Sequence, residues 1–169
     1  DDPSRAVMEG VQALVQAGHL NPKQTTRVVH ATTLFCNALI ERRGAKTGLL
    51  TTRGFRDSLE ISREKKFSLY DITLHKPEPL VPRLLRCEVI ERIDANGSIK
   101  TEIDTGSVEN GAKTLIESGV TSIAIVFLHA YSNPAHEKLA AQLLSRAYPD
   151  ISITSSSEVA PEIREYERA

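Results

Sequence analysis

The sequence has few cysteines, no excess of either charge and no long apolar run, and each absence excludes a class of protein. Two cysteines, Cys36 and Cys87, cannot by themselves form a zinc cluster or a disulfide framework. The 21 basic and 22 acidic residues leave a net charge of −1, which argues against binding nucleic acid by neutralising phosphates. The longest apolar run, 123–128, is far shorter than the roughly 20 residues that span a bilayer. Without a basic and apolar leader at the start, the chain is expected to be soluble and cytoplasmic, with no membrane or nucleic-acid partner.

What is present predicts one α/β domain of 169 residues with a packed core, since 40% of the residues are apolar. Helical spacing predicts a helix that begins near Asp2 or Pro3 and stops at Gly18. The next segments are predicted as a strand at 27–31, a helix through 34–40, a strand at 46–51 and a short helix at 54–61. This alternation implies a parallel sheet with crossover connections.

The second half of the chain continues the alternation after a long loop. Residues 62–86 contain three of the eight prolines and are predicted as an ordered loop or flap. The Asn96-Gly97 turn predicts a β-hairpin over 87–103. A helix at 105–118, a strand at 121–128, a helix at 134–147, a strand at 151–154 and a charged helix at 158–168 follow. Because the chain opens abruptly in a helix and ends on unpartnered apolar residues, we expect it to be a piece of a longer protein.

One polar cluster lies where a predicted strand meets a helix. His30 ends the strand, Thr32 and Thr33 begin the helix, and Asn37 follows one turn later. Carboxyl ends of parallel strands bind ligands, and free N–H groups at a helix start favour anions. The alternative is that Thr32 only caps the helix and His30 is a core imidazole, and spacing alone favours that alternative.

A second candidate follows the strand at 46–51. Arg53 can hold an anion, and Gly54 can let a backbone approach closely. The alternative, equally weighted, is an ordinary surface pair between an arginine and Asp57.

A metal site is the weaker interpretation of His129, His136 and Glu137. Imidazole and carboxylate are common ligands, but neighbouring helical residues point about 100° apart, and a third ligand is not evident. No serine-nucleophile or phosphate-loop motif is present, and Cys36 is interpreted as a small helical hydrophobe. We therefore expect no metal bound to these residues.

Several blocks together resemble the hydantoinase/5-oxoprolinase family. They begin with His30-Ala31-Thr32-Thr33 and continue in the family's order almost to the end of the chain. The matching blocks are 30–33, 37–45, 48–57, 76–83, 91–94, 127–137 and 157–168. The chain is thereby identified as the N-terminal region of the A-type, ATP-using subunit, similar to N-methylhydantoinase A.

The resemblance implies a ribonuclease-H-like, actin-like ATPase fold that lacks its first β-hairpin and carries a flap-like insertion at about 62–104. It implies a complete protein that uses ATP with Mg²⁺ to open a cyclic amide, together with the rest of the A subunit and a B-type subunit or fused half. The fragment alone, without the family's acidic Gly-Gly-Thr loop, is expected to be inactive and to bind no cofactor firmly. Ala31 replaces a family glycine. A ketone carboxylase subunit and a non-catalytic interaction module remain alternatives.

The same resemblance implies roles for individual residues. His30 is the candidate catalytic residue, and Thr32, Thr33, Asn37, Arg53 and Gly54 are the candidate contacts to substrate or phosphate. Tyr70 and Arg83 are candidates for a lid within the 62–86 segment.

Overall fold

The computed structural model describes residues 3–27, 29, 33–63, 70, 73 and 76–169 of the chain. These residues divide into two units, Asp1–Glu41 and Arg42–Ala169, and each is described by itself. The first unit contains helices α1 (Pro3–Gln16) and α2 (Leu34–Ile40), as the helical spacing predicts. No residue of α2 is buried. Arg27 and Val29 are not in a strand, and the other residues of the strand predicted at 27–31 lie outside the described residues.

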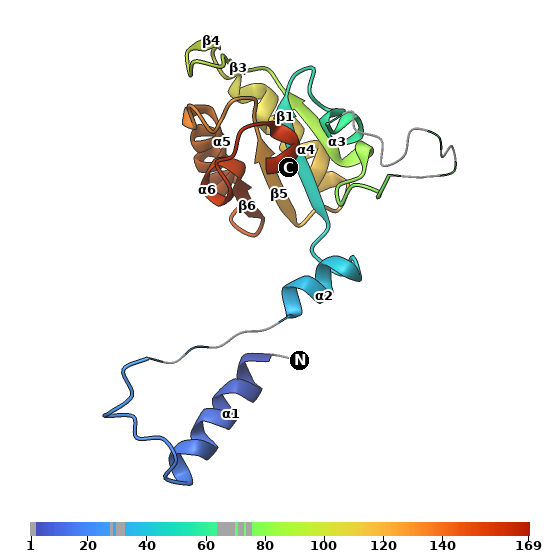
Figure 1. The fold of residues 1–169 in the computed structure, drawn as a ribbon. Helices are drawn as coiled ribbons and strands as arrows, with labels where there is room; N and C mark the ends of the chain where they lie inside the picture. The colour runs from blue at the N-terminus through green and yellow to red at the C-terminus, as the bar shows by residue number, and fades with distance from the viewer. Residues whose placement is uncertain (1–2, 28, 30–32, 64–69, 71–72, 74–75) are drawn as a thin grey trace. The chain divides into compact units, whose positions relative to one another are not determined.

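The second unit is built on a four-stranded parallel sheet in the order β2-β1-β5-β6 (Figure 1). The strands are β1 (Thr47–Thr52), β2 (Arg86–Val89), β5 (Ser122–Val126) and β6 (Ser152–Ser155). The chain passes from β1 to its neighbour β2 and then crosses to the other side of β1. The strand order therefore reverses between β1 and β5, and in open α/β sheets the ligand crevice lies at the carboxyl ends of the strands at such a point.

Two helices cover one face of the sheet and form most of the core with it. α4 (Thr105–Glu117) packs on β2 and β1, α5 (Ala135–Ala147) packs on β6 and β5, and the two helices contact each other. Their apolar residues recur at helical spacing, so each presents one apolar stripe to the strands. The central buried residues are Leu50, Val108, Ala112, Leu115, Ile123, Ile125, Ala140 and Leu144.

The remaining elements are short and lie around the sheet. α3 (Ser58–Ile61) contacts α7 (Glu165–Arg168), and α6 (Ser156–Val159) packs beside β5 and β6. A 3₁₀ turn, η1 (Arg83–Leu85), leads into β2. Part of the 62–86 segment, including residues 64–69, lies outside the described residues.

Two expected elements differ from those found. The hairpin is present as β3 (Arg92–Ile93) and β4 (Ile99–Thr101), but residues 86–89 form β2 of the main sheet instead of the hairpin's first strand. The helix expected at 158–168 is two short helices, α6 and α7, because Pro161 interrupts it and Arg164 has a φ of +79°. No described helix is long and apolar enough to cross a membrane.

Candidate functional site

The carboxyl ends of β1 and β5 are joined by the hydroxyl of Thr52, the last residue of β1. Thr52 Oγ1 accepts the backbone N–H of Leu128 at 2.8 Å, across the point where the strand order reverses. The same hydroxyl donates its proton to Oε1 of Glu91. Thr52 is fully buried, so both of its hydrogen bonds replace contacts with water.

Glu91 continues this buried network to the first turn of α5. Its Oε2 lies 2.7 Å from Nδ1 of His136, and both residues are almost fully buried. In the tautomer that carries its proton on Nδ1, His136 donates to this carboxylate oxygen. Nε2 of His136 is buried and has no hydrogen-bond partner among the described residues, and it lies 3.9 Å from the exposed carboxylate of Glu102.

Arg53 and Gly54 form the turn that leaves β1. The N–H of Arg53 donates to the Val89 carbonyl and the N–H of Gly54 donates to Glu88 Oε1, both at 2.9 Å. Neither amide is therefore free for a ligand. Gly54 has a φ of +89° with open space around it, so the turn requires glycine for its conformation. The exposed guanidinium of Arg53, which has no partner among the described residues, is the donor that remains.

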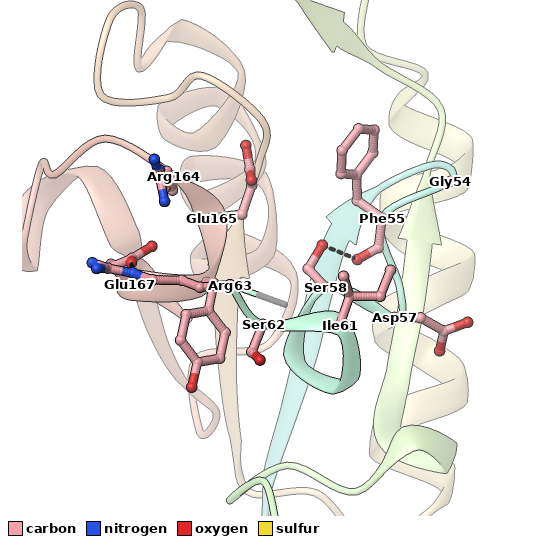
Figure 2. A pocket seen from close by; sticks show the side chains of 11 residues that line it. Gly54, Phe55, Asp57, Ser58, Ile61, Ser62, Arg63, Arg164, Glu165 and Glu167 are labelled. Atoms are coloured by element: carbon pink, nitrogen blue, oxygen red, sulfur yellow. Dashed lines mark hydrogen bonds and ion pairs between the residues drawn. The ribbon is translucent and has the colours of Figure 1, made fainter. Parts of the chain in front are cut away.

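A pocket of about 270 Å³ lies beside this turn, between residues 54–63 and the 164–167 segment. Figure 2 shows its two walls, with Phe55 and Ser58 on one and Glu165 and Glu167 on the other. Ser58 Oγ donates to the Phe55 carbonyl at 2.8 Å, and Arg63 forms an ion pair with Glu167. The lining combines charged side chains of both signs with the apolar rings and chains of Phe55, Ile61 and Tyr166.

The 76–86 segment is fastened to residues 56–62 by cations. Arg83 pairs with Asp57 through two hydrogen bonds, Nε to Oδ1 at 2.7 Å and Nη2 to Oδ2 at 3.1 Å. These bonds hold the pKa of Asp57 below its usual value and raise the pKa of Arg83. The buried guanidinium of Arg86 donates to the Val81 carbonyl and pairs with Glu60. The arginine that pairs with Asp57 is thus Arg83. Tyr70, the other residue predicted to belong to a lid, is 94% exposed.

Glu137 belongs to a separate buried network beneath β6. Its carboxylate accepts the N–H of Phe127 at 2.8 Å, the hydroxyl of Ser156 at 2.7 Å and the N–H of Ser157 at 2.8 Å. Arg168 donates to Ser156 Oγ at 3.0 Å and to the Phe127 carbonyl at 2.6 Å. Burial lowers the pKa of Arg168. The network joins the carboxyl ends of β5 and β6 to α7.

The candidate metal ligands do not converge. His136 contacts Glu91, whereas Glu137 contacts Phe127, Ser156 and Ser157. His129 has a φ of +58°, and its ring stacks edge-on with Tyr131. Within the part of the chain that the structure describes, no group of three His, Cys, Asp or Glu residues could hold a metal ion.

The remaining sequence candidates fall in the first unit. Thr33 caps α2 at its N-terminus without a side-chain hydrogen bond, and Asn37 lies in the middle of the same helix. Cys36 is exposed on α2. His30 and Thr32 lie outside the described residues. The structure brings Arg53 and Gly54 together at one turn. Thr52, Glu91, Glu102 and Arg168, all prominent in the second unit, were not among the sequence candidates.

Comparison with known proteins gives the same family as the sequence blocks. The hydantoinase/oxoprolinase N-terminal region matches residues 1–148. The caprolactamase α subunit of Pseudomonas jessenii is 35% identical, over 99% of this chain and 25% of that protein. The acetophenone carboxylase γ subunit of Aromatoleum aromaticum is 32% identical, over 82% of this chain and 21% of its own length. The 5-oxoprolinase of Saccharomyces cerevisiae is 30% identical, over 82% of this chain and 13% of its own length.

The likeness extends to a solved structure. The crystal structure of the ATP-dependent caprolactamase from Pseudomonas jessenii superposes with a TM-score of 0.81 and 35% identity, over 99% of this chain and 25% of that one. The chain thus spans about a quarter or less of the length of these relatives. The chain belongs to the hydantoinase/oxoprolinase family and corresponds to its N-terminal region.

Proposed function

We propose that the complete protein uses ATP to open a cyclic amide, and that this chain supplies part of the enzyme's N-terminal region. The observation that carries the proposal is the match to an ATP-dependent caprolactamase over 99% of the chain, in both sequence and structure. The name of a second relative, 5-oxoprolinase, also specifies a cyclic amide. The actin-like ATPase fold of the complete protein, the cytoplasmic location and the B-type partner belong to the same proposal.

ATP, bound with Mg²⁺, would supply a phosphoryl group to the amide oxygen of the ring with release of ADP. Water would then add to the carbonyl carbon, the C–N bond would break as the ring nitrogen takes up a proton, and inorganic phosphate would leave to give the open-chain carboxylate. We assign the exposed guanidinium of Arg53, which follows the last residue of β1 and has no partner among the described residues, to binding the negative charge of the phosphates or of the developing oxyanion. Gly54 sets the turn that presents it. His30 is the proposed acid or base, and Thr32, Thr33 and Asn37 are proposed contacts to substrate or phosphate. Tyr70 and Arg83 are the proposed lid residues.

A ketone carboxylase is the second candidate, and the relationship to an acetophenone carboxylase subunit favours it specifically. In that enzyme class the same phosphoryl chemistry would act on a ketone enolate. A non-catalytic interaction module is the third candidate.

ATP turnover by the complete gene product with its partner subunit separates these candidates. The compounds to add are caprolactam, 5-oxoproline, hydantoin, N-methylhydantoin, and acetone with bicarbonate. We expect one ring compound to stimulate phosphate release. Stimulation by the ketone alone would assign the carboxylase, and no turnover from folded protein would leave the interaction module.

Arg53→Ala in the complete enzyme should lower kcat/KM by about 10- to 100-fold, the usual range for removing a hydrogen bond to a charged group. Arg146→Ala is the matched control, because Arg146 is an exposed arginine in the last turn of α5. His30→Ala tests the proposed acid or base in the same assay. A variant with unchanged ATP-coupled turnover removes its residue from the site.

A further inference from the structure

Three buried side chains form one continuous hydrogen-bonded path beneath the turn that carries Arg53. We call Thr52, Glu91 and His136 the switch-point triad. Thr52 donates to one oxygen of Glu91, and His136 Nδ1 lies 2.7 Å from the other. The three residues are each at least 97% buried. The triad therefore ties the end of β1 and the start of α5 together through the β2–β3 connection.

The burial of the Glu91 carboxylate is weak evidence for a role in stability. Removing a carboxylate from water costs free energy that hydrogen bonds return only in part, and apolar side chains of similar size often serve stability equally well. What such a network adds is a unique geometry, because each hydrogen bond fixes a direction. Here the fixed atom is Thr52 Oγ1, which also accepts the N–H of Leu128 at 2.8 Å.

The backbone of Arg53 is affected directly by how Thr52 is held, because Arg53 follows Thr52 in the chain. Its backbone N–H donates to the Val89 carbonyl, and the N–H of the next residue, Gly54, donates to Glu88 Oε1. The backbone is therefore held on both sides of the Arg53 Cα. The side chain of Arg53 is exposed and has no partner among the described residues. The Cα from which this side chain leaves is therefore held directly beside Thr52, whose own hydroxyl is held by Glu91 and Leu128.

We propose that the switch-point triad consists of positioning residues for Arg53, which holds an anionic phosphate group at the carboxyl ends of β1 and β5. The inference rests on the role proposed for Arg53 above. The triad does not touch the ligand. It holds the end of β1 and the Leu128 amide in one arrangement, so that the backbone that carries Arg53 is already fixed when the anion binds.

The test uses the full-length polypeptide and measures the Kd of pyrophosphate by titration, beside the ATP turnover assay. Thr52→Val removes the hydroxyl and keeps the shape, and Thr52→Ser keeps the hydroxyl. Thr51→Val is the matched control, since Thr51 is also buried in β1 and its hydroxyl makes no hydrogen bond among the described residues. Arg53→Ala and the double variant Thr52→Val/Arg53→Ala complete a cycle that measures coupling between the two residues.

We expect Thr52→Val to raise the Kd about tenfold and Thr52→Ser or Thr51→Val to change it less than twofold. The double variant should bind like Arg53→Ala alone, because the triad acts only through the arginine. A purely structural role of Thr52 would instead multiply the two effects. Full multiplication, unchanged binding by folded Thr52→Val, unchanged binding by Arg53→Ala, or no pyrophosphate binding by the wild type would each overturn the inference.

His136 gives a second route if Thr52→Val fails to fold. The amide nitrogen of asparagine can take the place of Nδ1, whereas leucine cannot donate to Glu91. His136→Asn should therefore keep the wild-type Kd within threefold, and His136→Leu should raise it about tenfold. Equal values for the two variants would contradict the proposal. If lactam-stimulated turnover is intact but Thr52 and Arg53 show no coupling in the pyrophosphate Kd, only the inference is overturned. If the coupling is present but no lactam stimulates turnover, only the proposed function is overturned.

Discussion

Glu137 shows how a buried charge becomes a structural anchor at the scale of one residue. Its side chain is fully buried, and its two oxygens accept three hydrogen bonds from the ends of β5 and β6. Glu137→Ala would leave the N–H groups of Phe127 and Ser157 unpaired in the interior. We expect it to lower the free energy of unfolding by about 3 kcal/mol or more, measured by urea denaturation.

Glu117→Ala is the control for that loss. Glu117 is two-thirds exposed, and its pair with Lys113, 3.9 Å apart in one turn of α4, is of a kind that contributes only a few tenths of a kcal/mol. A cost for Glu137→Ala no larger than the cost for Glu117→Ala would contradict the anchoring role.

Asp57 gives a prediction that depends on pH. Hydrogen bonds from Arg83 hold its pKa below the ordinary value of 3.8, so folding favours the ionised form. Its contribution to stability is therefore fully present above the unfolded pKa and is lost as the pH falls through the folded pKa. The difference in unfolding free energy between wild type and Asp57→Asn should be constant from pH 7 to 5 and shrink below 3.8. Asp150→Asn, which removes an exposed carboxylate, is the control, and a gap that widens at low pH would contradict the assignment.

Residue by residue, the sequence indicates which side chains are polar but not which of them meet. Helical geometry correctly predicts that His136 and Glu137 point in different directions. No local sequence pattern indicates that Glu91 is part of a buried network, because its partners Thr52 and His136 lie 39 and 45 residues away along the chain. Long-range contacts of this kind depend on the sheet order, which spacing alone does not supply.

At the scale of elements, α4 lies so close to the sheet that one position accepts only glycine comfortably. A Cβ on Gly111 would lie 3.0 Å from Leu50 Cδ2 and 3.3 Å from Cys87 Cβ. Gly111→Ala gains about 1 kcal/mol of helix propensity but overpacks the core, which typically costs about 1–3 kcal/mol. We expect a net loss of stability of about 1 kcal/mol in urea denaturation.

Gly10→Ala is the matched substitution in α1, where a Cβ would have no neighbour within 4 Å. Only the propensity term acts there, so helicity measured by circular dichroism should rise. A rise in the free energy of unfolding for Gly111→Ala, with the expected rise in helicity for Gly10→Ala, would show that α4 does not lie this close to β1 and β2.

The prediction of elements succeeds where hydrophobic periodicity is long and fails where strands are short. The helices at 105–117 and 135–147 and the strand at 122–126 are confirmed because their apolar residues recur regularly. Residues 87–93 are predicted as one strand because they alternate in part between apolar and polar side chains. The break between β2 and β3 reflects tertiary pairing, in which Val89 joins β1 and Ile93 joins β4.

At the scale of the whole molecule, the core cluster lies entirely between Leu50 and Leu144. The fragment 42–169 should therefore unfold cooperatively in urea by itself, with a midpoint close to that of the 169-residue chain. The control is the fragment 1–41, in which α2 has no buried residue, and which should show no cooperative transition. A non-cooperative 42–169 fragment would mean that its core needs residues of the first unit.

The parallel sheet also has a consequence for how such proteins diversify. The four strands are parallel, so their carboxyl ends lie at the same end of the sheet, and the loops that follow the strands meet there. The loops at the opposite end lead the chain back into the next strand. Replacing residues in those loops changes what is recognised and leaves the strand register intact. The loops at this end of the sheet can therefore change in length and composition without redesign of the interior.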